Sequence, residues 1–524
     1  MAAVSTIALC AAASAQAGPS YRIYPSAVTQ TETFITRHPL NSSILFASAN
    51  TINLSTGFVS EGIYVSTNAG MSWSGSDTCN GAPITFHRGD PGIAIDKDGR
   101  FVLIRLSTIP GLYAHFSTDN GATWSSQRTV ATSDQDRASL ASDGDAGSAQ
   151  YGRCYATWVK FTTPFPVFYA YSDNGGSSWS TPAQINAPPQ RCQGGEVAIG
   201  PGGSVNVVWS GVIAASPFTE DYAGFARSTD GGTTWTVDEN AFDMNGIAGT
   251  FPTKSNIRVN GLPRLDVDDT GGARDGWIYV VSTEKNLAPA GSDPDVVFHR
   301  STDDGATWSA GIRVNQDPLN NGKFQYFPVV HVDDAGGVNV LYYDDRTTTS
   351  DSASVFLSRS SDGGTTWSEF EISDHHFRPS PIGGLGQGYQ GDNIALTSVG
   401  DTLWPLWMDN STGIYQIWTS PVDIGDPATG VESGVITLSN SHLRNFPNPF
   451  NPRTTVEFNL RSPGEVRLEI LSMTGARVAV PVNGVLDAGA HRVTIDAAGW
   501  PSGVYVYRLE SANAIEMRKM VLLR

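Results

Sequence analysis

An eight-residue motif recurs six times along the chain and constrains its fold more than any other feature. It reads Ser-x-Asp-x-Gly-x-Ser/Thr-Trp, and Asn68 and Asn174 take the aspartate position in two copies. Successive copies begin 51, 55, 56, 73 and 59 residues apart. Such a period indicates an array of similar units that bury their apolar faces against one another. The copies span residues 66–73, 117–124, 172–179, 228–235, 301–308 and 360–367.

The residue types of the motif predict a tight turn between two strands. One copy, for example, lies between the apolar run 296–299 and the short run 311–314. An Asp or Asn side chain can accept the backbone N–H groups of its own turn, and glycine allows a positive φ. The tryptophan is an apolar anchor for the hairpin. We therefore expect the motif aspartates to be structural rather than catalytic: Asp119, Asp230, Asp303 and Asp362.

Two further strands precede each motif and are joined by a second hairpin. Residues 92–96 and 100–104 flank one Asp-Gly turn, and residues 329–332 and 338–342 flank a Gly-Gly turn. Both dipeptides favour hairpins. Each unit therefore supplies four strands, which is one blade of a β-propeller.

The repeated motif resembles the Asp-box, or bacterial neuraminidase repeat, and residues 18–422 resemble the sialidase-like β-propellers that carry it. A seventh unit without the motif covers 393–418, but it lacks a fourth strand. Residues 21–25 resemble such a strand, so we expect them to complete the last blade and close the ring. The predicted fold class is all-β, a sialidase-like propeller with seven repeats and seven blades. Six blades, the usual number in sialidases, is the alternative.

The remaining C-terminal residues indicate a second, smaller domain. Residues 423–443 are rich in Gly, Ser, Asp and Thr and are expected to form a linker. Residues 444–524 then show period-2 alternation, which predicts a small Ig-like β-sandwich. Through FPNPFNP (446–452), SGVYVYRL (502–509) and the ending MRKMVLLR, this segment resembles the C-terminal sorting domain of type IX secretion substrates. A fibronectin-like accessory domain is the alternative.

The sorting-domain resemblance implies export across the outer membrane of a Gram-negative bacterium, with the type IX machinery as a partner. The protein would then be secreted or attached to the cell surface. Residues 1–17 agree with export, because an apolar run (7–13) precedes Ala15-Gln16-Ala17, a signal-peptide cleavage pattern. No Lys or Arg precedes that run, and no other segment is long and apolar enough to span a membrane.

The charge and the cysteines exclude some other classes of protein. A net charge of −18 disfavours nucleic acid as a partner, because the chain would repel phosphates. Removal of the signal peptide would take Cys10 and leave Cys79, Cys154 and Cys192. This odd number allows either one disulfide with one free thiol or three free thiols.

In a propeller, the loops that enter the first strand and leave the second strand of each blade converge near the axis. They form a concave funnel, which is where ligands bind by default. Carboxylates and aromatic rings are expected there, and both suit sugars; capping of strand ends is the alternative role for each residue. The candidate ligand-binding residues are Asp90, Arg137, Arg264, Gln325, Trp407 and Asp409, and the same ring includes Glu32, Glu284, Asp345, Trp158 and Trp209.

The sialidase resemblance implies a specific catalytic set: three arginines that clamp a carboxylate, a tyrosine nucleophile supported by a glutamate, and a separate aspartate. Arg137, Arg264 and Arg346 are the candidates for the clamp, whereas Arg22 is expected in an outer strand. The remaining catalytic candidates are Tyr343 (or Tyr342) as nucleophile, Glu196 as its partner, and Asp344 and Asp392 as acids.

Calcium is the only cofactor that the sequence suggests. The oxygen-rich turns 96–99 and 266–269 could bind it, although ordinary hairpin chemistry also explains them. No metal ligand is assigned.

Two functions therefore remain open. The first is a module that binds extracellular glycans or proteins without catalysis. The second is a glycoside hydrolase of exo-sialidase-like type that acts on extracellular glycans. Two carboxyls about 5 to 10 Å apart across an open funnel would favour the hydrolase.

Overall fold

The computed structural model describes residues 16–81, 86–425 and 444–523, apart from 447, 449, 461–463, 473–476, 488 and 512–513. The chain divides into two compact units at residue 425. The expected signal peptide up to residue 15, and the expected linker from residue 426, lie outside the described residues. Both units consist of antiparallel strands and turns, which confirms the all-β prediction.

The larger unit is a β-propeller of antiparallel sheets, and six of these have four strands that follow one another in the chain. Short 3-10 turns, η2 (Pro201–Gly203) and η3 (Pro252–Lys254), are its described helical segments. The first three sheets contain β3 (Thr29–Arg37), β4 (Leu45–Asn53), β5 (Gly57–Ser66), β6 (Ser74–Ser76); β7 (Gly92–Ile95), β8 (Phe101–Leu106), β9 (Leu112–Ser117), β10 (Arg128–Ala131); β11 (Gln135–Ser142), β12 (Cys154–Lys160), β13 (Val167–Ser172) and β14 (Ala183–Gln184). The next three contain β15 (Cys192–Gly200), β16 (Ser204–Val212), β17 (Glu220–Ser228), β18 (Thr236–Asp243); β21 (Arg264–Val267), β22 (Ile278–Glu284), β23 (Asp295–Ser301), β24 (Ile312–Arg313); β25 (Gln325–Val332), β26 (Val338–Asp344), β27 (Ser354–Ser360) and β28 (Ser368–Glu371).

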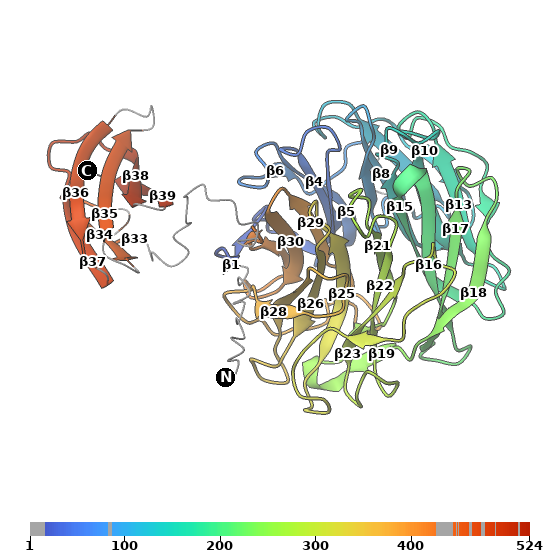
Figure 1. Ribbon diagram of the computed structural model, residues 1–524. Helices are drawn as coiled ribbons and strands as arrows, with labels where there is room; N and C mark the ends of the chain where they lie inside the picture. Colours follow the sequence, from blue (N-terminus) through green and yellow to red (C-terminus); the bar gives the residue numbers. More distant parts are fainter. Residues whose placement is uncertain are drawn as a thin grey trace, which may run out of the picture. The chain divides into compact units, whose positions relative to one another are not determined.

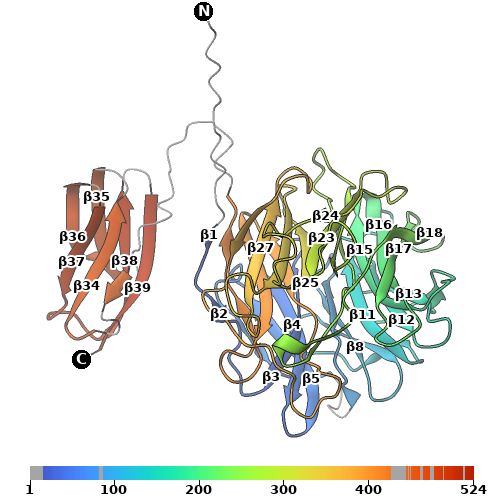
Figure 2. The same cartoon turned by 90° about the horizontal axis from the view of Figure 1, so that it is seen from below.

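A seventh sheet closes the ring by joining the two ends of this unit. It contains β29 (Ala395–Val399), β30 (Thr402–Asp409), β31 (Gln416–Thr419) and β32 (Val422–Asp423). Its outer strand is β2 (Tyr21–Arg22), which pairs with β31, while β1 (Gln16–Ala17) pairs with β32 (Figure 2). The expected closure by residues 21–25 therefore has its counterpart in β2. The same pairing places Arg22 opposite Trp418, in an outer strand.

The first strands of the seven sheets form a continuous inner ring. Each of β3, β7, β11, β15, β21, β25 and β29 contacts the next, and β29 contacts β3. Figure 1 shows the result, because the colours run around the unit from blue through green to orange and the last sheet lies beside the first. The loops that precede these strands therefore meet at one end of the ring.

The repeated motif forms the predicted turn in all six copies. In residues 301–308, Ser301 Oγ donates to Asp303 Oδ1 at 2.8 Å, and the Gly305 N–H donates to Ser301 Oγ at 2.8 Å. Thr307 donates to the same carboxylate through its N–H (2.9 Å) and its hydroxyl (2.6 Å). Gly305 has a φ of 85°, as the turn requires. The motif carboxylates are therefore occupied by their own turns.

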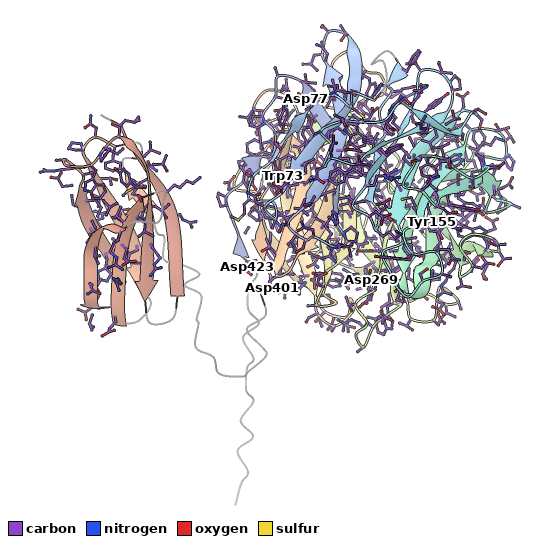
Figure 3. All side chains as sticks on the ribbon, turned by 90° about the horizontal axis from the view of Figure 1, so that it is seen from above. Trp73, Asp77, Tyr155, Asp269, Asp401 and Asp423 are labelled. Carbon is purple, nitrogen blue, oxygen red and sulfur yellow. The ribbon has the colours of Figure 1, made fainter. Side chains whose placement is uncertain are left out.

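The motif also joins each sheet to the one before it. The Trp308 ring packs edge-on against Phe225 of the preceding sheet with centroids 5.2 Å apart. A Cβ added at Gly305 would lie 2.1 Å from the same Phe225 ring, so only glycine fits. Trp235 and Gly232 contact Tyr169 in the same way. Figure 3 shows Trp73, the first motif tryptophan, on the sheet that also carries Asp77.

An insert between the fourth and fifth sheets crosses part of the loop face. It contains the hairpin β19 (Gly249–Phe251) and β20 (Ile257–Val259), joined by η3. Buried Lys254 fixes it to the sixth sheet through Asp345 Oδ2 (2.7 Å) and the Ser352 carbonyl (2.7 Å). The Arg258 N–H donates to the Gly388 carbonyl, in the segment before β29, at 2.8 Å. The insert thus spans from the sixth sheet to the seventh.

The three described cysteines, Cys79, Cys154 and Cys192, are buried free thiols. Burial raises the pKa of each to about 12, so they are protonated at neutral pH. Their odd number allowed either one disulfide with one free thiol or three free thiols, and the described structure has three free thiols.

The smaller unit has two sheets around one core. One contains β33 (Arg444–Phe446), β34 (Arg453–Leu460) and β37 (Gly489–Asp496). The other contains β35 (Gly464–Ser472), β36 (Arg477–Leu486), β38 (Gly503–Ser511) and β39 (Ala514–Leu522). Phe458, Leu468 and Tyr507 share the core, so the sheets pack face to face. Phe450 of the proline-rich segment accepts from Leu523 N–H at 3.0 Å and donates to the Val521 carbonyl at 2.9 Å.

Candidate functional site

A cavity of about 1000 Å³ opens at the loop end of the inner ring. Its walls come from the first four sheets, from the insert and from the segment before β29, with no described residue of the sixth sheet among its lining. It contains carboxylates, arginines and aromatic rings together. We call it the funnel.

The funnel holds a pair of carboxyl groups that face each other, Glu32 on β3 and Asp90 before β7. Glu32 is only 4% exposed. Its pKa is raised well above the usual value, first by burial and then by the charges of Asp90 and Asp392. Burial raises the pKa of Asp90 to about 6, with Asp136 contributing, and the two side chains are hydrogen-bonded to each other. The pair therefore binds one proton between two acids near neutral pH.

Neighbouring polar groups fix this pair in position. Asn50 Nδ2 donates to Glu32 Oε2 at 3.0 Å, and Asn50 Oδ1 accepts the Asp90 N–H at 2.8 Å. Buried Glu61 accepts the Gly89 N–H at 2.9 Å and contacts His87 Nδ1 at 2.5 Å. The loop that carries Asp90 is thus held from both sides.

The backbone at the acid pair is in an uncommon conformation. Glu32 and Asp90 have φ values of 55° and 54°, and Arg137 has 46° at the related position of the third sheet. The pairing register shifts at Glu32 and at Arg137, which marks β-bulges in these inner strands. Bulges re-aim side chains next to functional sites, and positive φ at non-glycine residues is strained. The bulge after Asp136 brings both Asp136 and Arg137 to the funnel wall.

Two more carboxylates and an arginine complete the polar surface. Asp392 Oδ2 accepts from Asn260 Nδ2 at 2.6 Å and lies 3.8 Å from Arg258 Nη2. The Arg258 guanidinium lies over the Tyr389 ring, 5.1 Å from its centroid. Burial, and then Asp392, raise the pKa of Asp136. Arg258 and Asn260 both come from the insert.

Asn393, which lines the funnel before β29, links the third and fifth sheets through one side chain. Asn393 Oδ1 accepts from Arg137 Nη2 at 2.8 Å and also from Arg264. Arg264 forms an ion pair with Glu196 of β15. The predicted residues Arg137, Arg264 and Glu196 therefore meet, but the donors of Arg264 are used inside the protein.

The sixth sheet departs from the sequence prediction. Asp344 is fully buried and accepts from Arg346 N–H and Nε, both at 2.7 Å. Gln325, also buried, donates to Asp344 Oδ1 at 3.2 Å, and Arg346 also pairs with Glu369. None of Asp344, Arg346 and Gln325 lines the funnel. The sequence predicted catalytic and ligand-binding roles for them. The structure instead places them in an ion-pair cluster within the propeller wall.

Tyr343, Trp407 and Asp409 are likewise internal. Tyr343 is 1% exposed, and its hydroxyl donates to the Met408 carbonyl at 2.7 Å and accepts the Met408 N–H at 3.1 Å. Burial raises its pKa well above the usual value, which leaves no nucleophilic phenolate. Trp407 donates to Asp409 Oδ2 at 3.0 Å, and His375 contacts the same oxygen at 3.1 Å. These residues hold the sixth and seventh sheets together.

The other members of the predicted ring are also structural. Trp158 and Trp209 are core residues, and Asp345 anchors Lys254. Glu284 accepts from Ser282 Oγ at 2.6 Å, and burial raises its pKa to about 7. Tyr342 is buried against Ser358 at 2.9 Å.

The insert is the physical reason for these differences. Phe251, Ile257 and Val259 of the insert share a hydrophobic core with Tyr326 and Tyr343 of the sixth sheet. The residues that a bare propeller would present to the funnel are therefore covered on this side. The 73-residue spacing between the fourth and fifth motifs is the signal in the sequence that locates the insert.

The two oxygen-rich turns show hairpin chemistry. Asp96 Oδ1 accepts from the N–H groups of Asp98 (2.9 Å) and Arg100 (2.8 Å). Asp268 Oδ1 accepts from Thr270 through its N–H (3.1 Å) and its hydroxyl (2.6 Å). Across the part of the chain that the structure describes, no three His, Cys, Asp or Glu residues form a group that could hold a metal ion.

The comparison with protein families identifies the smaller unit. Residues 444–523 match the secretion system C-terminal sorting domain. The chain therefore carries a type IX sorting signal, and the protein is exported across the outer membrane to the cell surface or the medium. No helix in the described ranges has the length and hydropathy needed to cross a membrane.

No curated protein matches this sequence. Among solved structures, a protein of unknown function from Dyadobacter fermentans is 15% identical, covers 65% of this chain and 96% of its own, and gives a TM-score of 0.40. A polysaccharide lyase, an ulvan lyase, is 11% identical over 75% of this chain and 93% of its own, with a TM-score of 0.46. An α-L-arabinanase from Penicillium chrysogenum is 14% identical over 63% and 94%, with a TM-score of 0.42.

Proposed function

We propose that this protein is an exported glycoside hydrolase that binds extracellular glycans in the funnel. The observation that supports the proposal is the Glu32–Asp90 pair, which keeps a protonated carboxyl group in an open, polar cavity. A carboxylic acid with a raised pKa is the general acid that glycosidic bond cleavage needs.

In the proposed reaction, Glu32 gives its proton to the glycosidic oxygen of the leaving sugar. A water molecule adds to the anomeric carbon and passes a proton to a second carboxylate, for which Asp136 and Asp392 are the candidates in the same cavity. The negative charge of Asp90 then disfavours the deprotonated form of Glu32, and this favours reprotonation of Glu32. The second carboxylate then releases its proton to solvent and Glu32 takes one up, so each cycle consumes one water and restores the initial state of the carboxyl groups.

The proposed reaction does not follow the sialidase pattern. Of two residues expected for the sialidase set, Tyr343 is buried in the sixth sheet, and Arg346 is paired with Asp344 outside the funnel. Burial and the charges of Glu32 and Asp90 also keep the pKa of Tyr389, the funnel tyrosine, well above its usual value. Proton donation by a carboxylic acid is the chemistry that remains.

The test is product release from a glycan panel by the full chain, read by mass spectrometry. The panel contains neutral, sialylated, uronate-containing and sulfated glycans. We expect new reducing ends from at least one of them, and a loss of about 10²- to 10⁴-fold in kcat for Glu32→Gln. Asp304→Asn is the matched control, since Asp304 is an exposed motif-turn carboxylate outside the funnel.

Cleavage that survives Glu32→Gln would contradict the assignment of the acid. Binding of a glycan without cleavage would instead identify the alternative function, a non-catalytic glycan-binding module.

A further inference from the structure

One wall of the funnel, formed by the third and fourth sheets, carries an arginine held between two aromatic rings. The Arg191 guanidinium lies 4.6 Å from the ring centroid of Phe165 and 4.6 Å from that of Phe218. Phe165 precedes β13 and Phe218 precedes β17, so two neighbouring sheets each supply one ring. Stacking fixes the plane of a guanidinium and leaves its N–H edge for a planar anion.

This guanidinium has no polar partner in the described part of the protein. Neither an acceptor within hydrogen-bond distance nor a carboxylate within ion-pair distance is present among the described residues, and its Nε is buried. A buried charged donor without a partner is costly. Arg137 and Arg264 differ, because both donate to Asn393.

A second unpartnered group lies on the same wall. Gln135, the first residue of β11, is 8% exposed, and neither its amide oxygen nor its amide nitrogen has a partner among the described residues. Its side chain lines the funnel together with Arg191. A side-chain amide can both donate to and accept from a hydroxyl group.

Exposed aromatic surface completes the wall. Phe161 is 39% exposed and Phe218 is 36% exposed, and both line the funnel. Phe161 packs edge-on against Phe165, with centroids 5.8 Å apart, so its ring is held in place. A rigid ring presents a flat apolar face to the apolar face of a sugar at little entropic cost.

We infer that Gln135, Phe161, Arg191 and Phe218 form a subsite for an anionic sugar residue, in the same cavity as the acid pair. Arg191 binds the carboxylate or sulfate through its N–H edge, Gln135 binds a hydroxyl group, and the phenylalanine rings contact the sugar face. The inference rests on the proposed function and narrows its substrate class to acidic glycans that occupy more than one subsite.

Binding by the full-length Glu32→Gln variant tests the subsite, because this variant is not expected to consume the ligand. The probes are a sulfated oligosaccharide, its desulfated counterpart and a uronate-containing oligosaccharide, titrated by calorimetry. In this background Arg191→Gln is expected to weaken binding of the charged probe at least 10-fold and to leave the neutral probe unchanged. Gln135→Ala is expected to weaken charged and neutral probes alike.

Arg128→Gln is the control for net charge, because Arg128 is an exposed residue of the outer strand β10 and lies outside the funnel. An equal loss with Arg128→Gln and Arg191→Gln would overturn the inference, as would the absence of binding by every charged probe. Preference for sulfate or for carboxylate identifies the anion, and either supports the subsite. Binding that depends on Arg191, without cleavage by the wild-type protein, would support the subsite while refuting the proposed hydrolysis.

Discussion

The carboxyl groups at two places around the propeller axis differ in how many hydrogen-bond donors the protein supplies to them. Asp90, paired with Glu32, and Asp344, paired with Arg346, each have a pKa raised to about 6, mainly by burial. Asp344 receives several donors from Arg346 and one from Gln325. Glu32 and Asp90 have each other and a single asparagine, Asn50, and they face a cavity.

A raised pKa alone therefore does not distinguish a functional carboxyl group from a structural one. Buried ion-pair networks perturb pKa values as active sites do. The useful distinction is whether the donors around the carboxylate are supplied by the protein. At the sixth sheet the protein supplies these donors, and the insert covers the carboxylate. At the first and second sheets the protein supplies few donors, and the carboxyl groups face an open cavity.

The largest stability effect is expected from breaking the protein-supplied cluster. Asp344→Ala removes the buried carboxylate that Arg346 binds, leaves this half-buried cation with fewer partners, and should lower the free energy of unfolding by about 3–5 kcal/mol. Chemical denaturation measures this loss. Activity per folded molecule should stay unchanged. Glu32→Gln, in contrast, should lose activity and keep its free energy of unfolding. A stable Asp344→Ala protein without activity would show that Asp344 is a functional carboxyl group and not a structural one.

The next effect concerns the insert that separates the two sides. Lys254→Met removes the cation that pairs with Asp345 at 2.7 Å and leaves this buried carboxylate unpaired. The expected loss is about 3 kcal/mol. Hydrogen exchange should quicken at β19, β20 and the sixth sheet but not at β3. The double variant Lys254→Met/Asp345→Leu, which removes both charges, should recover most of the loss; unchanged exchange in the single variant would argue against anchoring by Lys254.

A smaller effect is expected from pH. Folding raises the pKa of Glu32 and of Asp90, so their protonated forms stabilise the folded state. For Asp90 this contribution is fully present below pH 4 and is lost as pH rises through about 6. The wild-type protein should gain about 2 kcal/mol of stability between pH 8 and pH 5. Thermal unfolding at both pH values measures the difference.

Asp90→Asn should be more stable than wild type at pH 8 and should show a flatter profile, since its amide needs no proton. The motif carboxylates act in the opposite sense. Hydrogen bonds from Thr234 lower the pKa of Asp230 to about 2, so its contribution is lost only as pH falls below 4. A pH profile that Asp90→Asn leaves unchanged would remove the acid pair as its source.

The most local effect tests the contact between neighbouring sheets. Gly364→Ala places a Cβ 2.2 Å from the Phe298 ring at a φ of 88°, whereas Gly413→Ala has a φ of 99° and open space. Both carry the cost of a positive φ, so their difference isolates the clash. We expect Gly364→Ala to be less stable by about 1–3 kcal/mol. Equal losses in urea denaturation would mean that the motif glycine serves only its own turn.

The fold could be predicted to a large extent because its determinants are local and repeated. The Ser, Asp and Gly positions of each motif, with the Ser/Thr before its tryptophan, bond within eight residues, so the turn is encoded wherever the motif occurs. The outer strand β2 was expected from the strand that the seventh unit lacks. Both inferences need only short-range chemistry and the counting of units.

The funnel could be predicted only in part. Asp90, Arg137 and Asp392 line it as expected, and Glu32 proves to be the buried acid. Arg258, Asn260 and Arg191 were missed because their positions depend on an insert and on loops that obey no repeat. Asp344 and Tyr343 were misplaced for the same reason, since periodicity does not show what covers a strand end.

The closing sheet has a consequence for the order in which the chain can become complete. Ser420 Oγ donates to the Gly18 carbonyl across 402 residues at 2.6 Å, and Asp401 and Asp423 lie close together on this sheet in Figure 3. When the chain emerges with its N-terminus first, β1 and β2 therefore have no partner strands until residues 416–423 follow, and the ring stays open until then. Because the sorting domain comes only after them, a secretion machinery that recognises residues 444–523 receives a chain whose ring can already have shut.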